Sequence, residues 1–322
     1  MSEFPLLRVR HLSTDFLLPA DKRIARALED VSFDVHPGET VGLVGESGCG
    51  KTTALLSILR LLPANARISG QVFFKGVDLM ALSEKSMRDY RWRELAIVFQ
   101  GAMNALNPVM RVGEQIREAI TLHGLLPPDQ AETRVGELLE MVGIPKERGS
   151  QYPFQYSGGM RQRAMIAMAL ACSPSILFAD EPTTALDVMV QAQVLELLND
   201  IQQRLGLAIV LVTHDLGVVA EMCDTVVVMY GGMVAENGLV DDIFNNPQHP
   251  YTQKLLESFP DLARPTESLA SIPGAPPRLI EIPPGCRFEP RCHVRIEKCK
   301  TESPPLVQVG ETHLAACHLL KR

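Results

Sequence analysis

The sequence predicts an α/β fold with a parallel sheet, a helical insert in the middle of the chain, and an irregular tail rich in proline and cysteine. Three observations support this fold class. Short apolar, β-branched runs alternate with stretches of helical periodicity across residues 40–62 and 176–229. Residues 101–156 carry amphipathic helical patterns. Prolines become frequent beyond residue 238, which disfavours regular structure there.

The composition is that of a large globular chain. It has 322 residues, of which 46% are hydrophobic, enough for more than one structural unit. Its apolar runs, such as residues 225–230, fall far short of the roughly 20 residues that a membrane-spanning helix needs. Residues 1–10 lack the apolar stretch of a secretion signal, so we expect a soluble chain in the cytoplasm. A net charge of −7 without a long basic block argues against a nucleic-acid-binding protein.

The expected elements follow one another in the order that such a fold requires. Strands are expected over residues 7–9, 31–35, 40–44, 96–99, 176–179, 208–212 and 225–229. Helices are expected over residues 51–62, 112–123, 131–142 and 188–205. Pro63 ends the first of these helices, and the Pro127-Pro128 pair separates the second from the third. No internal repeat is visible, so we expect one copy of the fold.

A glycine-rich loop joins the strand expected at residues 40–44 to the helix that follows it. Its residues match the phosphate-binding P-loop pattern: Gly45, Glu46, Ser47, Gly48, Cys49, Gly50, Lys51 and Thr52. The glycines let backbone N–H groups and the helix N-terminus face phosphate oxygens. We expect Lys51 to reach the β- and γ-phosphates of ATP and Thr52 to ligate Mg²⁺, with Thr53 also in the ATP-binding set. A chance glycine-rich turn is the alternative, but the flanking strand and helix favour a nucleotide site.

Two carboxylates follow the apolar strand expected at residues 176–179. Asp180 is predicted to hold Mg²⁺ through water, and Glu181 to act as the general base that polarises the attacking water. Two acids after a strand also suit helix capping. Their occurrence together with a P-loop favours the catalytic interpretation.

Residues 156–163 resemble the signature motif of the ABC ATPase family, with Tyr156 and Met160 in place of its commoner Leu and Gln. The resemblance implies that residues of this motif bind the γ-phosphate of ATP held on an opposite subunit, so that hydrolysis requires a dimer. The residues assigned to this role are Ser157, Gly158, Gly159 and Met160. Ser157 also suits an ordinary helix N-cap, and both interpretations can hold.

Further elements of the same family occur in order along residues 6–238. Gln100 resembles the Q-loop glutamine that touches Mg²⁺ and the attacking water. Residues 185–187 resemble the D-loop at the dimer interface, in which we single out Asp187. His214 resembles the switch histidine that hydrogen-bonds the γ-phosphate. Phe16 occupies the place of the aromatic residue that stacks on adenine, although it could equally fill a core.

The tail resembles the C-terminal extension of the oligopeptide and dipeptide importer ATPases. The similarity rests on residues 249–252 (His-Pro-Tyr-Thr), 272–274, 285–288, 290–292, 299 and 316–318. The resemblance implies an ATP-hydrolysing subunit that powers peptide import by ATP-dependent dimer closure. Importers of nickel, glutathione or another small solute are the alternative, and a soluble ABC ATPase of DNA repair or ribosomes is a more distant one.

Four cysteines are concentrated in this tail, namely Cys286, Cys292, Cys299 and Cys317. In a cytosolic chain such a group favours metal binding over disulfides. The family resemblance favours a 4Fe-4S cluster, while Zn²⁺ and free or disulfide-paired thiols remain alternatives. His293, His313 and His318 are further candidate ligands.

The resemblance also implies the partners and the division of the chain. The expected partners are a second ABC ATPase subunit, identical or homologous, two transmembrane permease subunits docked near residues 102–108, and an extracytoplasmic solute-binding protein. The chain would lie on the cytoplasmic face of the membrane. Its segments would be residues 1–100 and 157–238 (nucleotide-binding core), 101–156 (helical subdomain) and 239–322 (C-terminal extension).

Overall fold

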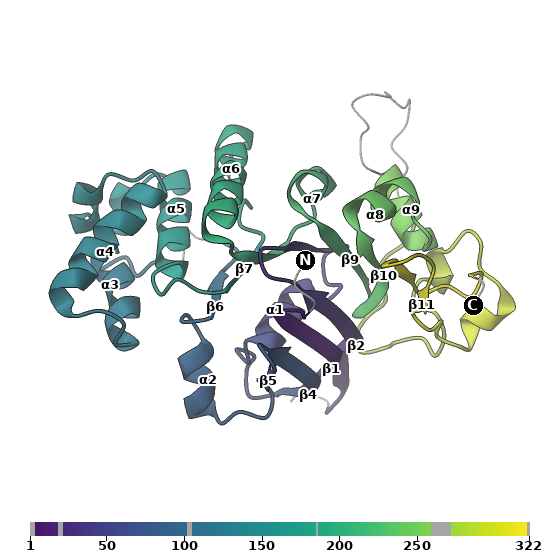
Figure 1. The fold of residues 1–322 in the computed structure, drawn as a ribbon. Coiled ribbons are helices and arrows are strands. Elements are labelled where there is room, and N and C mark those ends of the chain that lie inside the picture. The colour runs from purple at the N-terminus through teal and green to yellow at the C-terminus, as the bar shows by residue number, and fades with distance from the viewer. Residues whose placement is uncertain (1–3, 19–21, 102–104, 185, 259–271, 321–322) are drawn as a thin grey trace. The chain divides into compact units, whose positions relative to one another are not determined.

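The computed structural model describes residues 4–18, 22–101, 105–184, 186–258 and 272–320 (Figure 1). These residues form two compact units. One, here called the helical unit, contains His36–Glu39 and Ala81–Val212. The other, the P-loop unit, contains Thr40–Met80 together with the described chain before residue 36 and after residue 212. The four-part division expected from the sequence groups the chain differently and stays a prediction.

The helical unit is built on three parallel strands, β6 (Leu95–Val98), β7 (Ile176–Asp180) and β8 (Ala208–Val212), in the order β6-β7-β8. Every residue of β7 and β8 is buried, as continuous apolar runs predict for parallel strands covered on both faces. The helices of the unit are α2 (Glu84–Tyr90), α3 (Val112–Leu122), α4 (Pro128–Met141), α5 (Gly158–Ala169) and α6 (Val188–Leu205). Short 3₁₀ turns, Lys146–Ser150 and Pro153–Gln155, lead into α5.

The three helices α3, α4 and α5 contact one another, and Figure 1 shows them gathered in teal. The two helices expected between residues 112 and 142 are present in this group. The second begins three residues earlier than expected, at Pro128, because proline suits the first turn of a helix, where its missing N–H costs nothing.

The P-loop unit contains a four-stranded antiparallel sheet, which the expectation of a parallel sheet did not include. Its order is β2-β1-β4-β5. The strands are β1 (Leu7–Leu17), β2 (Ile24–Val35), β4 (Ala66–Phe74) and β5 (Val77–Asp78). The fold is therefore α/β with mixed sheets. Bulges in β1 interrupt the alternation of buried and exposed residues, which hid the full length of this strand in the sequence.

The same unit carries the strand that precedes the P-loop. β3 (Thr40–Val44) is fully buried and pairs in parallel with β9 (Thr225–Tyr230), which pairs antiparallel with β10 (Met233–Leu239). Helix α1 (Lys51–Ile58) follows the P-loop and is shorter than expected. Helix α7 (Leu216–Met222) lies between β8 and β9 in the chain.

The tail is more regular than expected and returns to the sheet. It begins with α8 (Val240–Asn245) and α9 (Pro250–Glu257). The short 3₁₀ turns Glu289–Arg291 and Glu297–Lys300 follow, and then β11 (Val307–Gln308) and β12 (Leu314–Ala315). β12 pairs with Glu236 and Asn237 of β10, so the end of the chain extends the sheet that carries β3.

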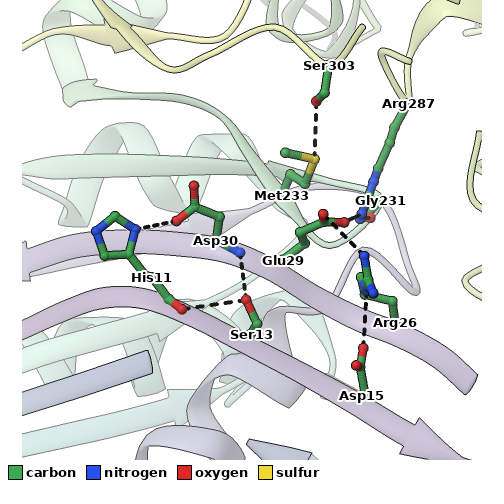
Figure 2. Close-up of polar contacts among 10 residues, drawn as sticks. All are labelled: His11, Ser13, Asp15, Arg26, Glu29, Asp30, Gly231, Met233, Arg287 and Ser303. Carbon is green, nitrogen blue, oxygen red and sulfur yellow. Dashed lines mark hydrogen bonds and ion pairs between the residues drawn. The ribbon is translucent and has the colours of Figure 1, made fainter. Parts of the chain in front are cut away.

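A buried arginine of the tail contacts strand β2 and the turn between β9 and β10. The Arg287 side chain, 4% exposed, donates to the Glu29 carboxylate on β2 and to the carbonyl of Gly231 in the turn between β9 and β10 (Figure 2). Glu29 also pairs with Arg26, whose Nη1 lies 3.4 Å from Glu29 Oε1.

Among the described helices, none has both the length and the apolar character needed to cross a membrane.

Candidate active site

The P-loop runs from the buried strand β3 into α1 with the backbone shape that its glycines predict. Gly45 has φ 146°, and a Cβ at this position would lie 2.2 Å from the carbonyl oxygen of Met229. A contact that short is impossible without moving backbone, so only glycine fits here. The helix N-terminus behind the loop leaves N–H groups available to phosphate oxygens.

Lys51 is buried in the loop and its ammonium is held there. Nζ donates to the carbonyl oxygens of Gly45 at 2.6 Å and Glu46 at 3.2 Å. The cation that should meet the β- and γ-phosphates is therefore held close to the loop backbone. Burial raises the pKa of the neighbouring Cys49 thiol, which favours the neutral form of this side chain. Thr52, the expected Mg²⁺ ligand, is exposed at the start of α1.

In the helical unit the structure brings together two predicted catalytic residues that are 81 positions apart in the sequence. Gln100 Nε2 donates to Glu181 Oε2 at 2.6 Å. Thr184 Oγ1 donates to the same oxygen at 2.8 Å. Thr184 was missed in the sequence, although its position three residues after Glu181 is compatible with a turn contact. Asp180, at the end of β7, is 2% exposed.

Glu181 also has an unusual backbone. Its φ is 45°, in the left-handed region that non-glycine residues seldom adopt, and such a conformation costs on the order of 1–3 kcal/mol. Its N–H donates to the carbonyl of Val212 at 2.9 Å, at the end of β8. Seven other non-glycine residues in the described part of the chain also have positive φ, so the combination of this backbone with the Gln100 contact is what suits the proposed general base.

The predicted signature residues lie at the start of α5. Ser157 is the N-cap, and its Oγ accepts a hydrogen bond from the Met160 N–H at 3.3 Å. A Cβ at Gly159 would lie 2.6 Å from Cγ1 of Val190 in α6, so glycine is needed for the close approach of these helices. The capping interpretation thus holds, and binding in trans stays a prediction.

Tyr156, which replaces a commoner leucine, is buried beside this helix start. Its hydroxyl donates to the carbonyl of Arg148 at 3.0 Å, and burial raises its pKa. The substitution is therefore accommodated with its polar group satisfied. Asp187 caps α6 by accepting from the Val190 N–H at 3.0 Å, while residue 185 of the expected D-loop lies outside the described residues.

Two further predicted site residues belong to the P-loop unit. His214 is exposed on the segment that leads into α7. Phe16 is half-buried near the end of β1, paired with Ala25 on β2 and Ala66 on β4. Its two small neighbours suit a surface on which a flat ring could stack.

The four tail cysteines line one cavity together with His249 and Phe288. Burial, together with a smaller contribution from the other three thiols, raises the pKa of the Cys286 thiol to about 11. Within the described ranges, no group of three or more His, Cys, Asp or Glu side chains is arranged to hold a metal ion. The surroundings are nevertheless compatible with a larger, thiolate-bound group because all four sulfur-bearing side chains border one space.

Two of the three histidines considered as alternative ligands, His313 and His318, have hydrogen-bond partners outside the cysteine group. His313 Nε2 lies 2.7 Å from Oε1 of the buried Glu236. His318 Nε2 lies 2.9 Å from the carbonyl oxygen of Glu302. His318, but neither His293 nor His313, also borders the cavity that the four cysteines line. The four cysteines are the main ligand candidates because all of them border this one space.

Comparison with known proteins agrees with these motifs. Residues 28–184 match the family model of ABC transporters, and residues 235–299 match the model of the oligopeptide/dipeptide transporter C-terminal region. A probable peptide ABC transporter ATP-binding protein of Sinorhizobium fredii is 49% identical over 317 residues, covering 97% of this chain and 94% of the relative. A dipeptide transport ATP-binding protein of Bacillus subtilis is 48% identical over 298 residues, covering 91% and 89%.

Solved structures share the fold. A dimeric ATP-binding cassette in a post-hydrolysis state with ADP and Pi is similar with a TM-score of 0.64 at 27% identity, covering 73% of this chain and 98% of that one. A subunit of a Clostridium perfringens ABC transporter complex is similar with a TM-score of 0.64 at 29% identity, covering 76% and 92%.

Proposed function

Because this chain belongs to the ABC transporter ATP-binding subunits of the oligopeptide and dipeptide import family, we propose that it hydrolyses ATP to power peptide import across the cytoplasmic membrane. The observation that carries the ATPase assignment is the strained Glu181, held by Gln100 directly after the buried strand β7. A carboxylate in this position can accept a proton from water, which nucleotide binding alone does not require.

Each site residue has a defined task in this proposal. Lys51 and the amides of the P-loop bind the β- and γ-phosphates, and Phe16 stacks on adenine. Mg²⁺ arrives with the nucleotide and is held by Thr52, Asp180 and Gln100. Glu181 accepts the proton of the attacking water, and His214 hydrogen-bonds the γ-phosphate.

A second ABC ATPase subunit, identical or homologous, completes each ATP site. Ser157 and the amides at the start of α5 bind the γ-phosphate held by that partner, so ATP closes the pair and phosphate release reopens it. Two permease subunits contact the segment around residues 102–108, of which residues 102–104 lie outside the described part of the chain. A solute-binding protein delivers the cargo, and the chain stays peripheral on the cytoplasmic face.

Purification of the assembled complex from membranes tests this function. ATP hydrolysis should rise when the solute-binding protein is loaded with di- or oligopeptides, and permease subunits should copurify with the chain. Stimulation by nickel or glutathione in place of peptides would move the assignment to another solute. A chain that copurifies with no permease subunit, or a complex whose ATP hydrolysis does not respond to any loaded solute-binding protein, would contradict the importer role.

We also propose that the four tail cysteines hold a 4Fe-4S cluster. Support comes from the one cavity that all four thiol-bearing side chains border. When bound, such a cluster would cross-link four points of a segment that is too short to build its own core.

Iron analysis of anaerobically purified protein tests the cluster. It should contain iron and labile sulfide and show broad visible absorption, and Cys292→Ser should reduce all three. Stoichiometric zinc without iron would replace the cluster by the zinc alternative.

A further inference from the structure

The second residue of the P-loop is held by the tail. Arg291 Nη1 donates to Glu46 Oε2 at 2.6 Å, and Arg291 Nη2 donates to Glu46 Oε1 at 2.9 Å. This is a bidentate pair between the two planar groups, with two parallel charge-assisted hydrogen bonds. The Arg291 side chain is only 5% exposed, so little water competes for the contact.

Every N–H group of this guanidinium has an acceptor. Besides Glu46, Nη1 donates to the Tyr230 hydroxyl at 3.2 Å, Nη2 to the carbonyl of Ile272 at 3.1 Å, and Nε to the carbonyl of Pro273 at 2.9 Å. The five donors of arginine therefore meet five acceptors, and the pair with Glu46 raises the pKa of Arg291. The orientation of the side chain is fixed by these contacts, and with it the position of the Glu46 carboxylate.

The backbone of Glu46 is fixed at the same time. Its N–H donates to the hydroxyl of Tyr251 at 2.9 Å, and Tyr251 is fully buried on α9. Its carbonyl accepts from Lys51 Nζ at 3.2 Å. Glu46 of the P-loop thus contacts the phosphate-binding Lys51 on one side and two tail residues, Tyr251 and Arg291, on the other.

We propose that Arg291 is a positioning residue of the nucleotide site, so that the C-terminal extension forms part of the support of the P-loop. Through Glu46, Arg291 holds the start of the loop in the shape that places Lys51 and the following amides against the phosphates. The inference rests on the proposed ATP-binding function of this loop. It assigns to the tail a role in nucleotide affinity, separate from any group bound by its cysteines.

The tail offers a matched control for this role. Arg287 is also a buried arginine of the same segment and is also paired with a glutamate. Its partners are Glu29 and the Gly231 carbonyl, neither of which belongs to the P-loop. Loss of either arginine should weaken the attachment of the tail, but only loss of Arg291 should release Glu46.

ATP affinity of the full chain, measured at equilibrium in a Glu181→Gln background, tests the proposal. We expect Glu46→Gln and Arg291→Met each to raise the Kd for ATP about tenfold, and the double variant to be no worse than either single one. Arg291→Lys should recover part of the affinity, and Arg287→Met should stay within about twofold of the parent. In the assembled complex, the KM for ATP should rise while kcat at saturating ATP changes little.

Unfolding curves without nucleotide identify variants that fail to fold. Because Glu46→Gln keeps the shape of the side chain and leaves Arg291 in place, it remains informative even if Arg291→Met is unstable. Unchanged ATP affinity in folded Glu46→Gln would overturn the proposal. So would additive effects in the double variant, or an equal loss in Arg287→Met. A parent chain that does not bind ATP at all would instead overturn the proposed function.

Discussion

The chain has two helix N-termini assigned to phosphate binding, and they are held in different ways. At the start of α5, Ser157 bonds to Met160, three residues further on. At the P-loop, Glu46 bonds to Tyr251 and Arg291, which are 205 and 245 residues away. The start of α5 is thus capped by a residue of its own segment, whereas the start of the P-loop is held by residues of the tail. Substitutions in the tail should therefore alter the P-loop, whereas the start of α5 should respond only to substitutions close to it.

The largest effect is expected in the helical unit, from Glu181→Gln. The amide retains the shape and can still accept from Gln100 or Thr184, but it cannot take the proton of water. We expect turnover of the assembled complex to fall by about a thousandfold, with ATP binding preserved. Steady-state ATPase assays and equilibrium binding measure the two quantities. The exposed Glu196→Gln on α6 is the control, and near-normal turnover in Glu181→Gln would remove the general-base role.

In the P-loop unit, Lys51→Ala should act on binding itself. Removal of the cation that faces the β- and γ-phosphates should raise the Kd for ATP by about a hundredfold. Calorimetric titration of the full chain measures this change. Lys75→Ala, which removes an exposed lysine of the same unit, should leave affinity unchanged. Equal affinities of Lys51→Ala and the parent chain would contradict the assignment.

Ser157→Ala asks whether the signature segment acts beyond its local cap. In dimers of this chain, we expect turnover to fall about tenfold when a hydrogen bond to the charged γ-phosphate is lost. Mixing Ser157→Ala chains with Lys51→Ala chains should then restore activity, because one composite site of the mixed dimer carries neither defect. No recovery on mixing would mean that Ser157 serves the P-loop of its own chain.

The smallest effect is expected from Gly159→Ala, which tests the local packing of α5. The new methyl group would lie 2.6 Å from the Val190 side chain, and overpacking of this kind costs on the order of 1–3 kcal/mol. Gly136→Ala on α4 is the control, because its Cβ would meet Lys146 at an ordinary 3.5 Å. Gly136→Ala should be neutral or stabilise by up to about 1 kcal/mol. Denaturant unfolding compares the two, and equal stabilities would refute the packing argument.

The comparison also shows which features could be predicted from the sequence. The strands β3, β7 and β8 are continuous apolar runs, and the P-loop and the acidic pair directly follow such strands. These patterns are local, so the strands and the motif positions were predictable. The pairing of Glu46 with Arg291 was not, because no pattern in either segment indicates contact across 245 residues. The antiparallel sheet was not predicted for a different reason: bulges in β1 interrupt the period-two alternation of buried and exposed side chains that marks a strand.

Hydrogen exchange of backbone amides tests the central claim most directly, because it reports on both helix N-termini in one protein. In Arg291→Met we expect the amides of residues 46–52 to exchange faster than in the parent chain, while those of residues 157–163 keep their protection. Arg287→Met should leave both segments unchanged. Unaltered exchange in the P-loop of a folded Arg291→Met variant, or equal acceleration in both segments, would contradict the view that the tail supports the nucleotide site.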